Sequence, residues 1–174
     1  VVGVLWSAVA TMELMRQTGL DTAGLGLALA TAEGLPADAF HAVYHRGGVM
    51  AGSSAGATVQ GSYLVRGATE GNHIMMAPGH EEGFGFLPET AIDQHAIVRQ
   101  RLDDMIPVIQ RHPQLLGIAI DESTALIVSG GVATVMGKSK VALYDSRLWK
   151  DQERRYFFLE KGQRYDLAAR RRLP

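Results

Sequence analysis

The segment from Gly52 to Ala57 reads Gly-Ser-Ser-Ala-Gly-Ala, and it stands between an apolar run at 48–51 and a plausible helix at 58–63. A strand, then Gly-x-Ser-x-Gly, then a helix is the order found in a nucleophile elbow, a tight turn that holds its central Ser in a strained conformation. Side chains on the flanking glycines would clash in such a turn. The pattern therefore predicts a strand-turn-helix unit that aims Ser54 outward. Because small-residue turns are also common without a catalytic role, the motif alone is a weak indication.

Composition limits what else the chain can be. Its 174 residues are enough for one domain with a real core, and 47% hydrophobic with 20% charged residues is ordinary for a globular protein. A net charge of −1 favours neither nucleic acid nor an anionic membrane as a partner. The absence of cysteine excludes disulfides, thiolate metal sites and a Cys nucleophile. We therefore expect no cofactor, no metal, no nucleic-acid partner and no membrane span.

The chain begins at Val1 within an apolar run, 1–6, that predicts a buried strand, and it does not begin with Met. We therefore expect upstream strands to be missing from this sequence. The protein is assigned to the cytoplasm, with secretion left open because a leader would precede Val1.

The early part of the chain mixes expected helices and strands, whereas the end is rich in short β-type runs. An Ala-, Leu- and Gly-rich stretch at 21–32 is interpreted as buried or as an oligomer interface, which leaves a homodimer open. A long Gly-rich loop is expected at 67–89, and such loops are usually functional or mobile. The pattern predicts a single α/β domain over 1–174. Its other expected helices are 11–17, 35–45 and 96–111, and its later strands are 91–92, 116–120, 125–128, 132–136, 141–144, 155–159 and 163–167, the last two as a hairpin-like pair.

A Ser hydroxyl needs a general base, and the base needs an acid that orients it. Of the 6 histidines, His95 stands out because it ends a short strand, and open α/β sheets form their sites at the carboxyl ends of strands. An equally weighted alternative is that Asp93-Gln94-His95 merely caps the following helix. The other five histidines are assigned to surface or loop positions, and no third ligand supports a metal pair of His73 and His80.

Three ordered blocks carry a resemblance: the segment Gly52 to Ala57, then Ile92-Asp93-Gln94-His95 with Arg99 and Arg101, then 117–125. Together with 162–167, they resemble the cyanophycinase family of serine peptidases, over roughly 46–173. That family is related to peptidase E. The resemblance implies a class I glutamine amidotransferase-like α/β fold with three layers, in which a mostly parallel sheet is flanked by helices.

The resemblance also implies a catalytic set. Ser54 would be the nucleophile, His95 the general base and Glu70 its acidic partner, and the backbone N–H of Ala55 would be one oxyanion donor. The alternative for Glu70 is a solvated loop acid.

Substrate recognition would fall to residues around His95. Arg99 and Arg101 would bind a substrate carboxylate, which a guanidinium can hold with two parallel hydrogen bonds. The alternative is two surface arginines. Asp93 and Gln94 would shape the pocket, and Asp121-Glu122 would either lie near the site or form a structural turn.

Two departures from the family pattern bear on activity. The segment Ser7 to Thr11 lacks the expected Gly-Gly-Asp-Gln-like turn, which would supply a second oxyanion donor, and Asp104 stands where a basic residue is expected.

We expect a serine peptidase that cleaves an amide next to an aspartyl residue, in cyanophycin or an aspartyl dipeptide. The alternatives are a catalytically impaired binding or assembly protein and an amidotransferase-like hydrolase of another acyl substrate.

Overall fold

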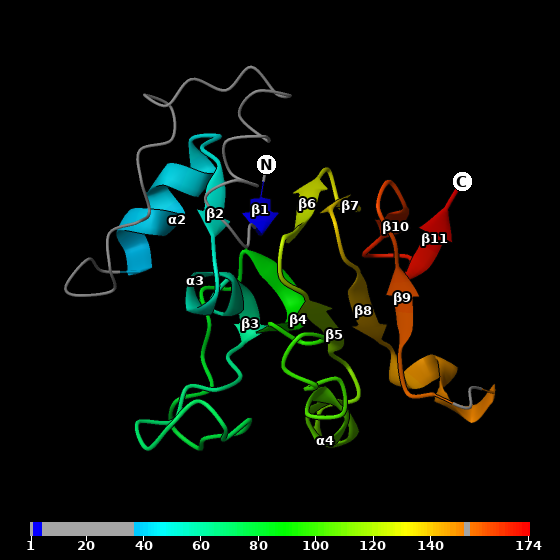
Figure 1. Ribbon diagram of the computed structural model, residues 1–174. Helices are drawn as coiled ribbons and strands as arrows, with labels where there is room; N and C mark the ends of the chain where they lie inside the picture. Colours follow the sequence, from blue (N-terminus) through cyan, green and yellow to red (C-terminus); the bar gives the residue numbers. More distant parts are fainter. Residues whose placement is uncertain (1, 5–36, 152–153) are drawn as a thin grey trace.

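The computed structural model describes residues 2–4, 37–151 and 154–174 (Figure 1). The expected helix at 11–17 and the apolar stretch at 21–32 lie outside these residues. In chain order, the elements are β1 (Val2–Val4), α2 (Ala37–His45), β2 (Met50–Gly52), α3 (Ala55–Thr58), β3 (Gly61–Tyr63), β4 (Leu87–Gln94), α4 (Met105–Arg111), β5 (Leu116–Ile120), β6 (Thr124–Ser129), β7 (Val132–Gly137), β8 (Val141–Tyr144), the 3-10 helix η1 (Ser146–Asp151), β9 (Phe157–Leu159), β10 (Arg164–Asp166) and β11 (Arg171–Leu173).

The strands form two sheets. A six-stranded sheet has the order β11-β10-β7-β6-β1-β2, and a five-stranded sheet has the order β3-β4-β5-β8-β9. Parallel pairing joins β1 to β2 in the first sheet, and β3 to β4 and β4 to β5 in the second. The later strands pair antiparallel with their neighbours. The parallel strands therefore gather on the side of the molecule that also carries the Gly52–Ala57 turn.

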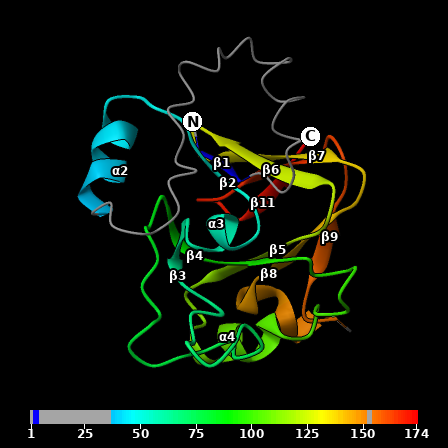
Figure 2. The ribbon, with the colours of Figure 1, turned by 60° about the vertical axis from the view of Figure 1, so that its left-hand side comes forward.

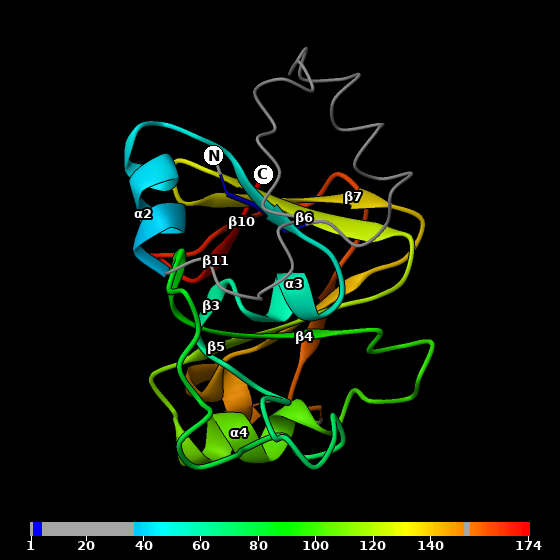
Figure 3. The ribbon, with the colours of Figure 1, turned by 90° about the vertical axis from the view of Figure 1, so that its left-hand side faces the viewer.

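The two sheets face one another in a layered arrangement. Figures 2 and 3 show the six-stranded sheet above the five-stranded sheet, with α4 beneath the latter and α3 at the margin between them. One hydrophobic cluster combines residues of both sheets, including Leu126 and Val135 from the first and Ile118 and Leu143 from the second. A second cluster fills the opposite face of the five-stranded sheet, where α4 packs. The five-stranded sheet is therefore buried on both faces.

Strand β5 shows how the sequence produces this double burial. Successive side chains of a strand point to opposite faces. Ile118 and Ile120 enter the core between the sheets, whereas Ala119 faces the α4 side. At Gly117 an added Cβ would lie 2.8 Å from Met105 Cγ and 2.9 Å from Tyr144 Cβ, so the absence of a side chain lets α4 approach the sheet. Strands buried on both faces read as continuous apolar runs rather than as alternating ones.

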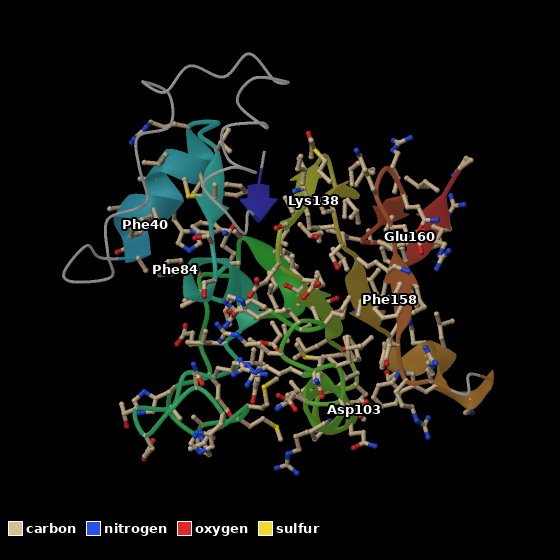
Figure 4. The ribbon with its side chains drawn as sticks, viewed as in Figure 1. Phe40, Phe84, Asp103, Lys138, Phe158 and Glu160 are labelled. Atoms are coloured by element: carbon tan, nitrogen blue, oxygen red, sulfur yellow. The ribbon has the colours of Figure 1, made fainter. Side chains whose placement is uncertain are left out.

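Helix α2 lies outside the sheets and has no buried residue. Phe40 stacks on Phe84 with a centroid distance of 5.2 Å, and Figure 4 shows the two rings next to each other. Tyr44 also contacts Phe86, with a centroid distance of 5.4 Å and the rings tilted by 47°. Aromatic contacts of this kind connect α2 to the segment that precedes β4.

The α/β class and the strand-rich C-terminal part are confirmed, but several details differ from the sequence-based expectation. The described strands are not mostly parallel and form two sheets. The residues expected as a helix at 58–63 divide into the end of α3 and strand β3. The expected pair of 155–159 and 163–167 is no hairpin, because β9 pairs with β8 in one sheet and β10 pairs with β7 and β11 in the other. Within the described residues, no helix is long and apolar enough to cross a membrane.

Candidate active site

The turn after β2 has the geometry of a nucleophile elbow. Ser54 follows β2 by two residues, immediately precedes α3, and has φ 53° and ψ −122°. A Cβ on Gly52 would overlap the backbone carbonyl of Gly56, so only glycine fits there. At Gly56, by contrast, a Cβ would meet no described atom within 4 Å. The expected steric requirement therefore holds at the first glycine, whereas the described residues impose none at the second.

The strained backbone of Ser54 makes a prediction about stability. A non-glycine residue in a sparsely populated conformation of this kind costs about 1–3 kcal/mol, and glycine is largely free of that cost. After allowance for the greater freedom of glycine in the unfolded chain, Ser54→Gly should raise the free energy of unfolding by on the order of 1 kcal/mol. Ser54→Ala is the matched control, because it removes the hydroxyl and keeps the strain. Urea denaturation of the two variants checks this, and equal stabilities would contradict a strained elbow.

The Ser54 hydroxyl is hydrogen-bonded to a histidine from a distant part of the chain. Ser54 Oγ lies 3.1 Å from His95 Nε2. His95 directly follows β4, is 5% exposed and has a positive φ of 58°. The two residues are 41 positions apart in sequence, and α3 contacts both β2 and β4. The fold therefore brings together the predicted nucleophile and the predicted base.

The second ring nitrogen of His95 meets a carboxylate. His95 Nδ1 lies 2.9 Å from Glu122 Oε1. Because an ionised carboxylate only accepts hydrogen bonds, Nδ1 carries the proton and donates, which leaves Nε2 to accept from the Ser54 hydroxyl. Glu122 follows β5, which pairs in parallel with β4 so that Gln94 lies opposite Ile120. Parallel pairing thus delivers His95 and Glu122 to the same sheet edge.

Glu70, expected from the resemblance to orient His95, lies elsewhere. Its side chain is exposed, and its Oε2 accepts a hydrogen bond from Thr69 Oγ1 at 3.2 Å. The carboxylate that hydrogen-bonds His95 Nδ1 is that of Glu122. Glu122, like His95, follows the carboxyl end of a strand, and this shared position is a signal in the sequence that points to both residues.

The backbone N–H of Ala55, the expected oxyanion donor, lies at the start of α3 directly after Ser54. The N–H groups of Gly56 and Ala57 donate to the carbonyls of Ser53 and Ser54. The hydrogen bonds of the described residues leave the N–H of Ala55, next to Ser54, without an acceptor. The segment Ser7 to Thr11, where a second donor was sought, lies outside the described residues.

The four residues expected to bind substrate occupy different environments. Asp93 is fully buried, and its carboxylate accepts hydrogen bonds from Arg66. Gln94 is 6% exposed, and its Oε1 has no hydrogen-bond partner among the described residues. Arg99 is exposed, and its N–H donates to the carbonyl of His95, four residues earlier, at 3.1 Å. Arg101 is partly buried, with an Nη1 that lacks a partner among the described residues. Gln94 Oε1 and Arg101 Nη1 are therefore buried polar atoms whose hydrogen bonds are not satisfied by the described residues.

The pKa of Arg101 depends on both basic and acidic residues near it. Burial and the positive charge of Arg66 lower the pKa of Arg101 from its usual value, while Asp93 and Asp104 act in the opposite direction. A ligand carboxylate next to Arg101 would stabilise its charged form, because it would accept the missing hydrogen bond from Nη1 and supply a compensating negative charge.

Arg66 is a prominent feature that the sequence-based reasoning missed. Its Nε and Nη2 donate to the two oxygens of Asp93 at 2.7 and 2.8 Å. Nη2 also donates to Asp104 Oδ2 at 2.7 Å, and Nη1 donates to the Asn72 carbonyl at 2.8 Å. Burial alone would lower the pKa of Arg66, but Asp93 and Asp104 outweigh it and raise the pKa above its usual value. No local signal could have found this set, because its partners lie 6 to 38 positions away.

Asp121 supports the segment that follows His95. Its Oδ1 accepts hydrogen bonds from the N–H groups of Ile97 and Val98 at 3.0 and 2.9 Å, and its Oδ2 accepts one from Ser139 Oγ at 2.6 Å. Asp121 is 6% exposed and immediately precedes Glu122. Both readings of Asp121-Glu122 therefore apply, since Asp121 organises the turns and Glu122 contacts His95.

The part of the chain that contains Ser54, His95 and Glu122 is similar in sequence to known proteins. The model of Peptidase family S51 matches residues 19–136. Curated proteins named cyanophycinase are similar: that of Trichormus variabilis is 38% identical over 108 residues, which are 58% of this chain and 35% of the relative. That of Synechococcus elongatus is 35% identical over 113 residues, which are 62% of this chain and 34% of the relative. The chain thus spans about a third of the length of these relatives.

A solved structure is also similar, a peptidase from an acI-B1 Actinobacterium. It has 25% sequence identity and a TM-score of 0.48, and the match covers 73% of this chain and 50% of the other. Since the family model spans Ser54, His95 and Glu122 in one continuous match covering more than half of the chain, the chain belongs to peptidase family S51.

Proposed function

We propose that this chain carries the catalytic site of a serine-type peptidase that hydrolyses an amide bond next to an aspartyl residue. The observation that carries the proposal is the hydrogen-bonded series from Ser54 through His95 to Glu122, with distances of 3.1 and 2.9 Å. Nucleophile, base and orienting carboxylate in this order are the arrangement by which a Ser hydroxyl becomes reactive at neutral pH. In this proposal Glu122 takes the role expected of Glu70.

The first half of the reaction forms an acyl-enzyme. Ser54 Oγ attacks the carbonyl carbon of the scissile amide while its proton passes to His95 Nε2. Glu122 stabilises the resulting imidazolium through Nδ1, and the Ala55 N–H donates to the oxyanion. The intermediate collapses as the C–N bond breaks, and His95 gives its proton to the leaving amine.

The second half restores the enzyme. Water enters the place of the amine, His95 Nε2 takes one of its protons, and the hydroxide attacks the ester carbonyl carbon. The bond to Ser54 Oγ then breaks, and Ser54 recovers its proton from His95. The products are a free carboxylic acid and a free amine, and no external reagent besides water is consumed.

Recognition of an aspartyl substrate is assigned to the arginines beyond His95. Arg101 offers a buried, unpartnered Nη1, and Arg99 lies four residues after His95. A substrate carboxylate can accept hydrogen bonds from both. Gln94, with its unpartnered Oε1, would accept a hydrogen bond from a substrate N–H. The name cyanophycinase of the similar proteins supports cyanophycin as one substrate to test.

The test is a substrate panel with matched controls. Cyanophycin, β-aspartyl-arginine and an α-aspartyl dipeptide are compared with the corresponding asparaginyl and glutamyl dipeptides, and Ser54→Ala serves as the blank. We expect hydrolysis of at least one aspartyl substrate and much weaker hydrolysis of its asparaginyl match, because the amide cannot form the charged pair. Hydrolysis that is equal in wild type and Ser54→Ala would refute the catalytic assignment. A wild type inactive on the whole panel would favour the binding or assembly alternative.

A further inference from the structure

The guanidinium of Arg66 joins parts of the chain that are distant in sequence. It extends from a residue three positions after β3 and donates from all three of its nitrogens. Its partners are the carboxylates of Asp93 and Asp104 and the backbone carbonyl of Asn72. The Arg66 side chain is 3% exposed and that of Asp93 is 0% exposed. A buried arginine bound with this geometry is rigid, because rotation about its side chain would break several hydrogen bonds together.

The Asp93 carboxylate links Arg66 to the backbone beside the catalytic base. Besides its two bonds to Arg66, Asp93 Oδ1 accepts the N–H of Gln94 at 2.8 Å. The next residue is His95, whose φ of 58° is unusual for a residue without glycine's freedom. Such a conformation persists only where the surrounding structure holds it. Arg66 therefore fixes the two residues that lead into the strained backbone of His95.

The opposite side of His95 is held separately. Asp121 binds the N–H groups of Ile97 and Val98, so the chain is anchored both before and after the base. In both anchors an aspartate accepts backbone N–H groups, and on the side before His95 that aspartate, Asp93, is itself held by Arg66. Arg66 can therefore be substituted to weaken this anchor without changing the side chain that contacts the backbone.

We propose that Arg66 is a positioning residue, which through Asp93 holds His95 at hydrogen-bonding distance from Ser54. The inference rests on the proposed function, since it assigns to His95 the role of general base. Arg66 itself touches neither substrate nor reacting atoms in this proposal. Its loss should therefore slow the chemical step and leave substrate binding nearly unchanged.

The test compares Arg66→Lys and Arg66→Met with wild type. Lys keeps the charge that compensates Asp93 but cannot form the paired hydrogen bonds, and Met removes both. A displacement of about 1 Å in a catalytic group can cost about 10²-fold in rate. We expect kcat to fall about 10-fold in Arg66→Lys and about 10²-fold in Arg66→Met, with KM within about 3-fold of wild type. The rate at which a fluorophosphonate labels Ser54 should fall in parallel.

Arg147→Met is the matched control. Arg147 also forms a paired interaction with a buried aspartate, Asp145, through Nε and Nη2 at 2.7 to 3.0 Å. Asp145 and Arg147 follow the end of β8, and β5 lies between β8 and β4 in the sheet. This variant should lose stability yet keep the wild-type kcat and labelling rate. If folded Arg66→Lys keeps the wild-type kcat, or if its loss falls wholly on KM, the positioning role is refuted.

A second readout does not depend on activity. The Nδ1 proton of His95, held between the ring and Glu122, should give a slowly exchanging downfield ¹H signal in the wild type. The proposal predicts that this signal weakens or disappears in Arg66→Lys and remains in Arg147→Met. Persistence in Arg66→Lys would refute the positioning role. If wild type neither labels at Ser54 nor hydrolyses any substrate, the proposed function fails, and the NMR comparison still decides the role of Arg66.

Discussion

Replacing Ser54 by Ala is expected to lower the turnover of a cleaved aspartyl peptide by about 10⁶-fold. Loss of the nucleophile in a serine peptidase removes the covalent pathway, and effects near this size are measured in such enzymes. The substitution deletes one hydrogen bond to His95 and leaves the backbone of the elbow as it was. Steady-state hydrolysis checks the effect, together with circular dichroism to show that the fold is retained. A loss below about 10-fold would mean that another group attacks the substrate.

Ser53→Ala is the natural control for this variant. Ser53 stands next to Ser54 in the same turn, but its side chain is exposed and lies outside the Gly-x-Ser-x-Gly register. We expect nearly wild-type turnover. The pair of variants thus separates loss of a hydroxyl in general from loss of the hydroxyl that contacts His95.

Replacing Glu122 by Gln is expected to lower kcat by about 10⁴-fold. The amide cannot stabilise the imidazolium, and its N–H₂ group can donate to Nδ1, which favours the tautomer with the proton on Nε2. In that tautomer His95 can no longer accept the proton of Ser54. The measurement is kcat at saturating substrate, and the loss should persist at every pH where the protein is folded.

Glu70→Gln makes the same chemical change at the carboxylate that was expected from the resemblance. Because Glu70 is exposed and bonds Thr69, this variant should keep kcat within about 2-fold of wild type. If Glu70→Gln were the impaired variant and Glu122→Gln were active, the geometry around His95 would be wrong. The two variants together therefore decide which carboxylate serves the base.

The strands of the core could be predicted because a strand that is buried on both faces consists of a continuous run of apolar residues. The runs at 116–120 and 141–144 coincide with β5 and β8. What the sequence could not show is the choice of partners. Lys161-Gly162 has the composition of a hairpin turn, and Gly162 has φ 81°. This turn follows β9 of the five-stranded sheet, yet the Gly162 N–H donates to the carbonyl of Val135 in β7 of the six-stranded sheet. The chain crosses between layers there, and only tertiary packing decides that.

The helix expected at 96–111 shows how side-chain hydrogen bonds override periodicity. Its apolar positions follow a helical spacing, but α4 begins only at Met105. Asp121, from a distant strand end, binds the N–H groups of Ile97 and Val98, and Gln100 has φ 54°, which breaks a continuous helix. The chain between His95 and α4 is consequently a series of turns that carries Arg99 and Arg101.

For the site, the sequence led to Ser54 and His95 because each belongs to a local pattern at the end of a strand. Glu122 and Arg66 act through contacts with residues that lie 27 positions away in the chain. Glu122 shares with His95 its place after the end of a strand, whereas no local pattern marks Arg66. For Glu122 the missing information was that β5 is the parallel neighbour of β4. For Arg66 it was that three separate segments converge on one guanidinium.

Adduct mapping shows directly whether Ser54 is the residue that forms the covalent bond to substrate. Wild type, Ser53→Ala, Ser54→Ala and Glu122→Gln are incubated with a fluorophosphonate, digested, and analysed by mass spectrometry. We expect a single phosphonylated residue, Ser54, in wild type and Ser53→Ala, a strongly slowed reaction in Glu122→Gln, and no adduct in Ser54→Ala. An adduct on Ser53, an unmodified wild type, or equal labelling of Ser54→Ala would contradict it.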